Sequence, residues 1–466
     1  MKDLSDKLKQ LASRSPHWVE FRYHRRNVQT LQVQKGLVKQ LKSSITSGVG
    51  IRVLVNGAWG FSATSDLSDA SLEKSLKQAI ECGNSLSQVK QSKVKTLPKV
   101  TLAQGEFVLP GYESLSKMSL EEKLEAVRRA EAKTRERSTA IETASGYYNE
   151  IFEDKIVVTS DGADALSRLV RNEFRLSAFA GKAGEKASAT QTVGRTGSWE
   201  CLFEDHSMES LSEEAARLAV DLVGAPRVQG GLATLILSPA MVGLLSHEAI
   251  GHTVEADFVL SGSVAAGKLG QTVASPLVTL IDGGKVESAP HGGGDLLVDD
   301  EGVPTQNTEI IKDGVLKSYL HNRESAAAFN VQPTGNARAW LYNDEPLIRM
   351  RNTYIQPGTQ SIEEIIAGTE DGYLVDGPRG GQADSTGEFM FGAQNVSRIK
   401  NGKVTELLRG ATISGQAFKV LSTVDAVSKE FKLDLGAGYC GKGQPAKVDA
   451  GGPYIRCKAL VGGIQE

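Results

Sequence analysis

Residues 235–252 read LILSPAMVGLLSHEAIGH, and this stretch decides how the second half of the chain begins. The apolar run at 233–237 is typical of a buried strand. Ser238 followed by Pro239 indicates a helix start, because serine caps the first turn and proline needs no hydrogen-bond partner there. We therefore expect a strand followed by a helix, and this helix carries two histidines and a glutamate.

His247, Glu248 and His252 form a pattern that chance explains poorly. Seven histidines in 466 residues predict roughly 0.1 histidine pairs at any fixed spacing, and a glutamate after the first lowers this about tenfold. Zinc helices carry H-E-x-x-H, with both histidines on one face, whereas the spacing here is H-E-x-x-x-H. On a regular α-helix, five positions turn the two side chains ~140° apart, too far for one metal. We therefore expect a π-bulge near residues 248–252, or a helix that breaks at Gly251.

A catalytic zinc needs three protein ligands and one open position. The candidates for the third ligand are Glu255, Asp257, His291, His321 and Cys440. Glu255 lies three residues past His252, as a carboxylate on the following turn would. Cys440 lies in the glycine-rich segment 436–444, whose glycines allow a close approach of the backbone and expose the thiol. The residues alone leave the third ligand open between Glu255 and Cys440.

The first half of the chain alternates predicted strands and helices. Asn56-Gly57 stands between two apolar runs and predicts a hairpin, because both residues tolerate positive φ. The segment 119–122, Ser-Leu-Glu-Glu, is a capping box that predicts the start of a helix. The segment 225–231, APRVQGG, is the expected linker. We therefore expect an N-terminal α/β domain over residues 1–225.

The second half is richer in glycine turns. Asp282-Gly283, Asp313-Gly314 and Asn401-Gly402 each join short apolar runs, as the turns of antiparallel hairpins do. We expect residues 226–466 to form a mostly antiparallel β domain with one metal-binding helix. The chain as a whole is therefore assigned to the α+β class.

The composition excludes several classes of protein. The chain has 53 Lys+Arg, 56 Asp+Glu and a net charge of −3, which argues against a protein that coats nucleic acid. Four cysteines and seven histidines are too few for a disulfide scaffold or a zinc-finger array. The charged start, MKDLSDKLKQLASRS, shows no secretory signal, and no apolar run approaches ~18 residues. We therefore expect a cytoplasmic protein without nucleic-acid or membrane partners.

Short motifs spread along the whole chain resemble those of one protein family. They lie at residues 50–52, 59–61, 247–252, 255–257, 298–302, 333–336, 350–354, 380–384, 438–444 and 460–463. Together they resemble the TldD/PmbA (TldD/TldE) peptidase family over nearly the whole length. One branch of that family keeps the histidine motif and the cysteine and carries the metal, whereas the other lacks them and is a non-catalytic partner. This chain is similar to the metal-bearing branch.

The resemblance implies a ligand set and an activity. It selects Cys440 as the third metal ligand beside His247 and His252, with one Zn²⁺ per catalytic chain, although other transition metals suit similar ligands. It implies a metalloprotease that acts on small or unfolded peptides. It also implies a dimer that encloses a cavity, formed either with a second copy or with a TldE/PmbA-like chain.

The ligand set suggests roles for the neighbouring residues. Glu248 is expected to be the general base, which takes a proton from the metal-activated water and later gives it to the leaving amine. Glu255 or Asp257 either hydrogen-bonds a ligand imidazole or belongs to an exposed acidic helix end. The segment 378–391 is a glycine-rich loop or, alternatively, a strand edge for an extended peptide. The alternative function is a non-catalytic binding or regulatory protein of the gyrase-modulator type.

Overall fold

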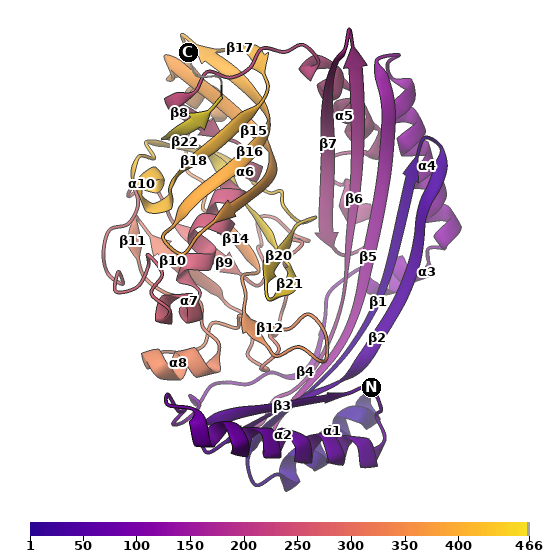
Figure 1. Ribbon diagram of the computed structural model, residues 1–466, viewed down its shortest axis with the longest axis vertical. Coiled ribbons are helices and arrows are strands. Elements are labelled where there is room, and N and C mark those ends of the chain that lie inside the picture. Colours follow the sequence, from indigo (N-terminus) through magenta and orange to yellow (C-terminus); the bar gives the residue numbers. More distant parts are fainter. Residues whose placement is uncertain (464–466) are drawn as a thin grey trace.

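Two large β-sheets organise the chain, which we describe over residues 1–463 in a computed structural model (Figure 1). Within these residues the first sheet has seven strands in the order β3-β2-β1-β5-β6-β4, with β7 beside β6. The strands are β1 (Trp18–Gln34), β2 (Leu37–Val55), β3 (Ala58–Thr64), β4 (Gln104–Val108), β5 (Ile141–Thr159), β6 (Asp164–Lys182) and β7 (Glu185–Thr196). The accompanying helices are α1 (Lys2–Arg14), α2 (Asp69–Val89), α3 (Tyr112–Lys117), α4 (Leu120–Glu136), the 3₁₀ helix η1 (Glu200–Phe203) and α5 (Met208–Leu222).

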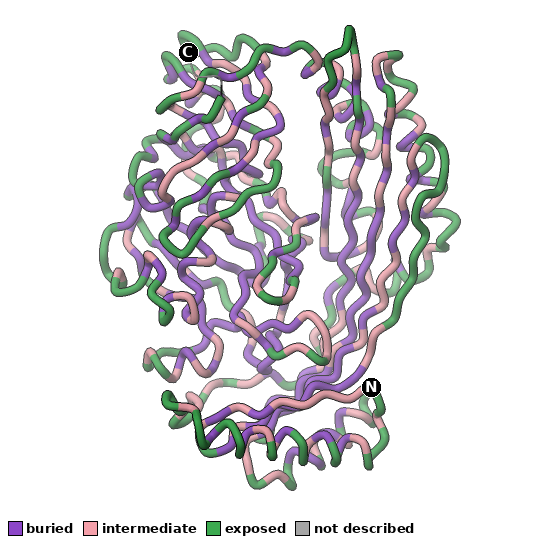
Figure 2. The backbone as a smooth tube through the Cα atoms, in the orientation of Figure 1, coloured by how far each residue is buried: buried purple, intermediate pink, exposed green. Residues whose placement is uncertain are grey.

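The turn and the helix cap that the sequence predicts in the first half of the chain are both present. Asn56 and Gly57 both have positive φ, 48° and 83°, and they turn β2 into β3. Ser119 caps α4 in a complete capping box. Two pairs of helices cover the sheet: α4 and α5 pack over a core that contains Phe174, and α1 and α2 pack over one that contains Phe21. The strands are long, and the tip of the β1–β2 hairpin is exposed (Figure 2).

The second sheet has eleven strands within the described residues, in the order β11-β10-β9-β14-β22-β18-β16-β15-β8, with β17 beside β16 and β19 beside β22. They are β8 (Gly231–Leu237), β9 (Leu280–Gly283), β10 (Asn307–Lys312), β11 (Val315–Leu316), β14 (Asn352–Ile355), β15 (Asp371–Ala383), β16 (Glu388–Lys400), β17 (Lys403–Leu408), β18 (Ala411–Gln416), β19 (Ala426–Leu433) and β22 (Asp449–Gly462). Two small ribbons join β12 (Ala337–Arg338) to β13 (Leu347–Ile348) and β20 (Tyr439–Lys442) to β21 (Gln444–Lys447). The helical segments are α6 (Pro239–Leu244), η2 (Leu245–Gly251), η3 (His252–Val254), α7 (Ala256–Leu260), α8 (Arg323–Phe329), α9 (Ile362–Ala367) and α10 (Ala417–Ser422).

Strand pairing in this second sheet is mostly antiparallel, as predicted, with two parallel exceptions. β14 runs parallel to β22, and β15 runs parallel to β8. The long strand β22 lies at the centre, because it pairs with β8, β14, β18 and β19. The α+β class expected from the sequence is confirmed. The segment 225–231 lies between α5 and β8, and the domain boundary at residue 225 stays a prediction.

Ion pairs that are largely buried tie the first sheet to the segment between β9 and β10 and to the β20–β21 ribbon. Lys155 of β5 reaches Asp300 at 2.9 Å, and Arg52 of β2 reaches Glu301 at 2.6 Å. Lys447 of β21 pairs with a glutamate of β6 in the same way. Removing one partner of such a pair leaves an uncompensated buried charge, so these contacts hold the first sheet and the second half of the chain in one arrangement. No helix among the described residues is long and apolar enough to cross a membrane.

Candidate metal centre

The helix that follows β8 changes its geometry at the predicted place. Ser238 Oγ accepts from the backbone N–H of Met241 at 3.4 Å and caps α6, with Pro239 in the first turn. The chain then continues as the π-helix η2 and the 3₁₀ turn η3. The backbone N–H of His252 donates to the carbonyl of His247, five residues earlier. The wider turn brings positions five apart above one another, and the predicted departure from α geometry is confirmed.

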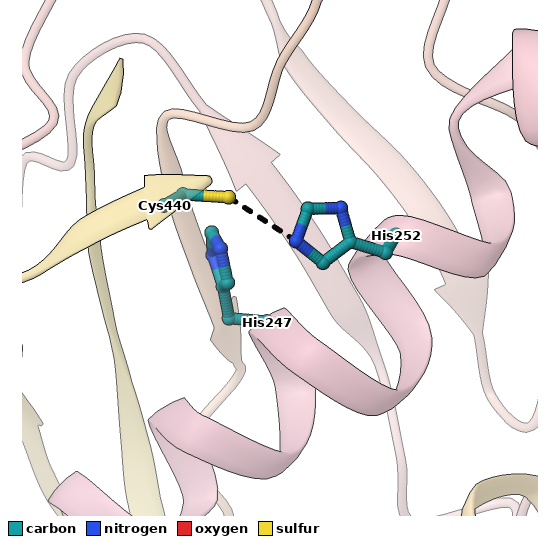
Figure 3. Close-up of side chains that lie close together, drawn as sticks. All are labelled: His247, His252 and Cys440. Carbon is teal, nitrogen blue, oxygen red and sulfur yellow. Dashed lines mark hydrogen bonds between the residues drawn. The ribbon is translucent and has the colours of Figure 1, made fainter. Parts of the chain in front are cut away.

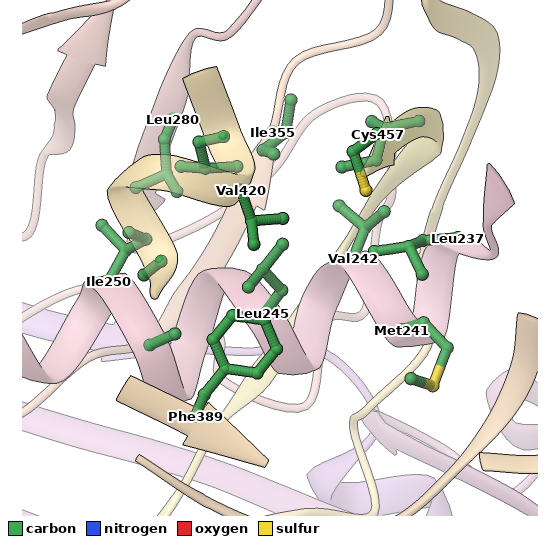
Figure 4. Close-up of a cluster of buried hydrophobic side chains, with 14 of the residues drawn as sticks. Leu237, Met241, Val242, Leu245, Ile250, Leu280, Ile355, Phe389, Val420 and Cys457 are labelled. Carbon is green, nitrogen blue, oxygen red and sulfur yellow. The ribbon is translucent and has the colours of Figure 1, made fainter. Parts of the chain in front are cut away.

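Close packing explains why this helix can lie so deep in the fold. Leu245 and Ile250 belong to the main apolar core between the helix and the second sheet (Figure 4). A Cβ added to Gly243 would lie 2.6 Å from the backbone of Ala450, and one added to Gly251 would collide with Met350. Both glycines therefore permit contacts that a larger residue would prevent. The helix is held rigidly, and so are the side chains on its other face.

Three side chains converge beside this helix. His247, His252 and Cys440 each offer one ligand atom, and these atoms lie within 4.8 Å of one another (Figure 3). Cys440 Sγ is 3.1 Å from His252 Nε2, and the two imidazole centroids are 5.3 Å apart. The cysteine comes from β20, 188 positions after His252 in the chain. The structure thus brings together the three residues that the resemblance selected.

The cysteine is placed by a small hairpin tied to its surroundings. Arg349 donates to the carbonyl of Cys440 at 2.7 Å, and Asn149 of β5 donates to the hydroxyl of Tyr439 at 3.1 Å. Cys440 pairs with Ala446 across the β20–β21 ribbon. These contacts fix the thiol against the π-helix although the two segments are far apart in sequence.

The cluster fits a metal ion. Both ring nitrogens of His247 are buried, and neither has a hydrogen-bond partner within residues 1–463. An unpaired buried polar group costs free energy, and a metal would satisfy one of these nitrogens. His252 Nδ1 lies 3.0 Å from Glu255 Oε2, which leaves Nε2 free for a metal. Two imidazoles and one thiolate form a set that zinc binds well, with a fourth position open.

The charges of the cluster support a thiolate. Burial alone would raise the pKa of Cys440, but the neighbouring His247 and His252 lower it to about 4. Burial alone would lower the pKa of His252, but its hydrogen bonds to Cys440 and Glu255 raise it to about 10. Without a metal, these pKa shifts favour the thiolate and imidazolium forms of the pair. A divalent cation would replace the imidazolium proton beside a thiolate that is already ionised.

A second layer of contacts lies behind His252. Glu255 is fully buried, and its Oε2 also accepts from Lys442 Nζ at 3.0 Å. Burial would raise the pKa of this carboxyl, but His252 and Lys442 lower it below its usual value. Lys442 donates further to Asp257 Oδ1 at 2.8 Å and to the carbonyl of Ile348 at 3.0 Å. Glu255 is thus the residue that orients the imidazole, and Asp257 contacts the lysine instead.

Lys442 is a site residue that the sequence analysis missed. It follows Cys440 by two positions in β20, and alternation along a strand places both side chains on the same side of the ribbon. This period-two relation was the available signal. The lysine neutralises the carboxylate that holds His252, so it acts on the cluster through Glu255.

We expect a Glu255→Gln variant to bind zinc about 10–100-fold more weakly, the usual cost of losing an outer hydrogen-bond partner of a ligand histidine. The amide still fills the space, but it carries no charge to hold the imidazole or Lys442. Competition with a chromophoric chelator measures the affinity. Asp257→Asn is the matched control, because this carboxylate contacts Lys442 and the backbone N–H of Phe258 but not His252. An unchanged affinity in Glu255→Gln would contradict the orienting role.

Glu248 lies beside the cluster and also faces open space. Its Oε2 is 3.7 Å from His252 Nε2, and its side chain is 28% exposed. Together with His247 it lines a cleft of about 1500 Å³ between the two sheets, whose other walls include α5, β7 and β15. A carboxylate in this position can exchange protons with a molecule bound in the cleft.

The remaining histidine candidates lie elsewhere. His321 is buried with its Nδ1 3.0 Å from Ser325 Oγ and its ring against Phe329. His291 gathers with Cys201 and Glu204 rather than with the residues of the π-helix. Neither histidine belongs to the group formed by His247, His252 and Cys440.

Comparison with known proteins places the chain in a family. Three family profiles match it: PmbA/TldA metallopeptidase domain 1 over residues 19–82, the central domain over 113–223, and the C-terminal domain over 230–463. The chain belongs to the PmbA/TldA metallopeptidase family. The C-terminal profile contains the whole cluster of His247, His252 and Cys440. The domains of this family therefore account for nearly the entire chain.

Individual relatives of the PmbA/TldA family extend this finding. A metalloprotease of Methanocaldococcus jannaschii is 33% identical over 93% of this chain and 94% of its own length. A protein named zinc metalloprotease TldD homolog, from Saccharolobus solfataricus, is 29% identical over 91% of this chain and 92% of its own. The crystal structure of TldE from Thermococcus kodakarensis aligns with a TM-score of 0.80 at 19% identity, covering 98% of this chain and 99% of that one. The structural likeness shows that the fold is shared.

Proposed function

We propose that the protein is a zinc-dependent peptidase that hydrolyses small or unfolded peptides, with Glu248 as general base. The observation that carries this proposal is the convergence of His247, His252 and Cys440 beside a large cleft, which His247 and Glu248 line. The relatives named metalloproteases support the reaction class, and one of their names supports zinc. A non-catalytic binding protein would have no physical need for this set of residues.

The proposed ligands are His247, His252 and Cys440, which together carry one negative charge when both imidazoles are neutral. When bound, zinc supplies a Lewis acid that polarises a carbonyl and makes water a nucleophile near neutral pH. Other transition metals suit similar ligands, and zinc is the proposal because two nitrogens and one thiolate are among its preferred donors.

Three further side chains have roles in the proposed reaction. Glu248 accepts the proton of the attacking water and then delivers it to the nitrogen of the leaving amine. Glu255 holds His252 by its Nδ1 and keeps Nε2 directed at Cys440. Lys442 holds Glu255 in turn, at 3.0 Å. The helix, the carboxylate and the hairpin thus form one preorganised unit.

The walls of the cleft suggest how an unfolded chain binds. The segment 378–391, which the sequence left open between a loop and a strand edge, is strand for most of its length. Pairing of β15 with β8 stops at Val375, so beyond that point the only strand paired with β15 in the described chain is β16. The exposed side of β15 from Asp376 to Gly381 lines the cleft. We propose that an extended peptide pairs with this edge through its backbone.

Backbone pairing predicts a pattern in substrate analogues. We expect a single N-methyl group in the peptide backbone to raise KM several-fold at every second position and to change it little at those between, because alternate residues of a strand face its neighbour. Each lost hydrogen bond is worth about 1 kcal/mol. Initial-rate kinetics on a scanned series of one unstructured peptide measures this. The same positions carrying side-chain replacements are the control, and a flat N-methyl profile would contradict pairing at the edge.

The dimer and the cytoplasmic location remain proposals. The dimer is supported by the free part of β2, whose pairing with β3 begins only at Val49. Leu37, Leu41 and Ile45 of that part are exposed by 55–61%, an unusual amount of apolar surface for a long edge strand. A second chain would cover these side chains.

A further inference from the structure

A second group of possible ligands lies apart from the π-helix. Cys201, Glu204 and His291 each offer one ligand atom, and these atoms lie within 4.8 Å of one another. Cys201 belongs to η1 and is buried, with only 6% of its surface exposed. Glu204 is the next residue after η1 and is exposed, whereas His291 comes from the segment between β9 and β10. The group therefore joins the first sheet's unit to the second.

Backbone hydrogen bonds hold the histidine at this place. Thr196, the last residue of β7, donates its N–H to the carbonyl of His291 at 3.0 Å. His291 Nδ1 lies 3.2 Å from the carbonyl of Thr196. Arg171 of β6 donates to the carbonyls of Gly293 and Asp295 at 3.1 and 3.0 Å. The segment that carries His291 is thus fixed onto β6 and the end of β7, and His291 keeps a left-handed φ of 65° there.

A glycine leaves room between the thiol and the imidazole. A Cβ added to Gly197 would lie 2.9 Å from Cys201 Sγ and 3.1 Å from His291 Nδ1. Any larger residue at this position would crowd the thiol and the imidazole. Because the carbonyl of Thr196 can only accept a hydrogen bond, His291 Nδ1 carries the proton of that contact, and Nε2 is the atom left for a metal. The backbone of Gly197, with φ of 152°, is also one that other residues rarely adopt. The absence of a side chain at Gly197 therefore lets the thiol of Cys201 and the imidazole of His291 lie close to the same stretch of backbone.

We propose that Cys201, Glu204 and His291 bind a second divalent transition-metal ion, zinc by ligand preference, which ties the two sheet units together. A thiolate, a carboxylate and a neutral imidazole bring two negative charges, so a divalent ion makes the site neutral. The set His247, His252 and Cys440 carries only one negative charge, so that site with a divalent ion keeps a net positive charge. The second site is therefore suited to a structural role, and its exposed carboxylate makes it the weaker of the two.

The experiment counts zinc ions in four forms of the full-length chain. After equilibration with zinc and desalting, we expect two ions in the unmodified chain, one in Cys440→Ser, one in His291→Asn and none in the double variant. Asparagine is chosen because it tolerates the left-handed backbone at residue 291. Zinc should raise the melting temperature of Cys440→Ser and leave that of the double variant unchanged.

The count also separates this inference from the proposed peptidase. His291→Asn should retain peptide hydrolysis while it loses one ion, and Cys440→Ser should lose hydrolysis while it keeps one. Glu200→Gln, an exposed carboxylate on the same 3₁₀ turn but outside the group, should keep both ions. No ion in Cys440→Ser, or as many ions in His291→Asn as in the unmodified chain, would each overturn the second site, whatever the peptidase assays give. One ion in both the unmodified chain and Cys440→Ser would instead overturn the first site and support the second.

Discussion

A Glu248→Gln variant should keep its zinc and lose peptide hydrolysis by about 10²–10⁴-fold, the usual contribution of a general base. The amide has the shape of the carboxylate but cannot accept the proton of the attacking water. Because Glu248 is not one of the three converging ligands, the site itself should stay intact. Initial rates on an unstructured fluorogenic peptide, together with zinc per chain, measure both quantities.

The control for this variant is Glu213→Gln. Glu213 also lines the cleft, but it lies on α5 and its charge pairs with Arg137 at the surface. Neutralising it changes the charge of the cleft by the same amount, so a general electrostatic effect would appear in both variants. Full activity of Glu248→Gln at full zinc content would refute the role as base and leave the metal proposal standing.

The second large effect is expected for Cys440→Ser, which should remove one zinc ion per chain and abolish hydrolysis. A serine hydroxyl is not ionised near neutral pH, so zinc loses its anionic donor and keeps only His247 and His252. The affinity should fall by more than the about 10–100-fold that loss of an outer partner costs. Metal analysis after desalting measures the loss, and His252→Ala should give the same result.

Cys82→Ser is the matched control, because Cys82 is a free and half-buried thiol on α2, away from the cluster. Circular dichroism should show that all three variants fold. If Cys440→Ser held as much zinc as the unmodified chain, Cys440 would not be a ligand. The metal beside which Glu248 is proposed to act would then have a different set of ligands.

The histidine spacing allowed the local geometry of the site to be predicted. Two histidines five positions apart, like His247 and His252, cannot serve one metal on a regular α-helix. The spacing therefore required a departure from α geometry, and the π-helix provides it. The residues could not decide between Glu255 and Cys440, because both choices are compatible with local spacing. Only the resemblance to a family selected the cysteine, whose thiol lies 3.1 Å from His252. Its role as a ligand stays a prediction.

Contacts between residues far apart in the sequence could not be predicted from it, for a physical reason. Lys442 contacts Glu255 across 187 positions of sequence, and no periodicity encodes such a pair. The parallel pairings of β14 with β22 and of β15 with β8 likewise depend on how separate segments assemble. Hairpin turns such as Asn56-Gly57 were predictable because the two residues themselves determine the backbone.

The central position of β22 has a consequence for when the activity appears. This strand is the last of the described elements, and β8, which leads into the π-helix, pairs with it directly. During synthesis the histidines emerge from the ribosome long before the cysteine and β22 do. The sheet that supports the helix therefore cannot close until the final strand has been made. Synthesis must therefore pass β22 before the sheet can hold His247, His252 and Cys440 together.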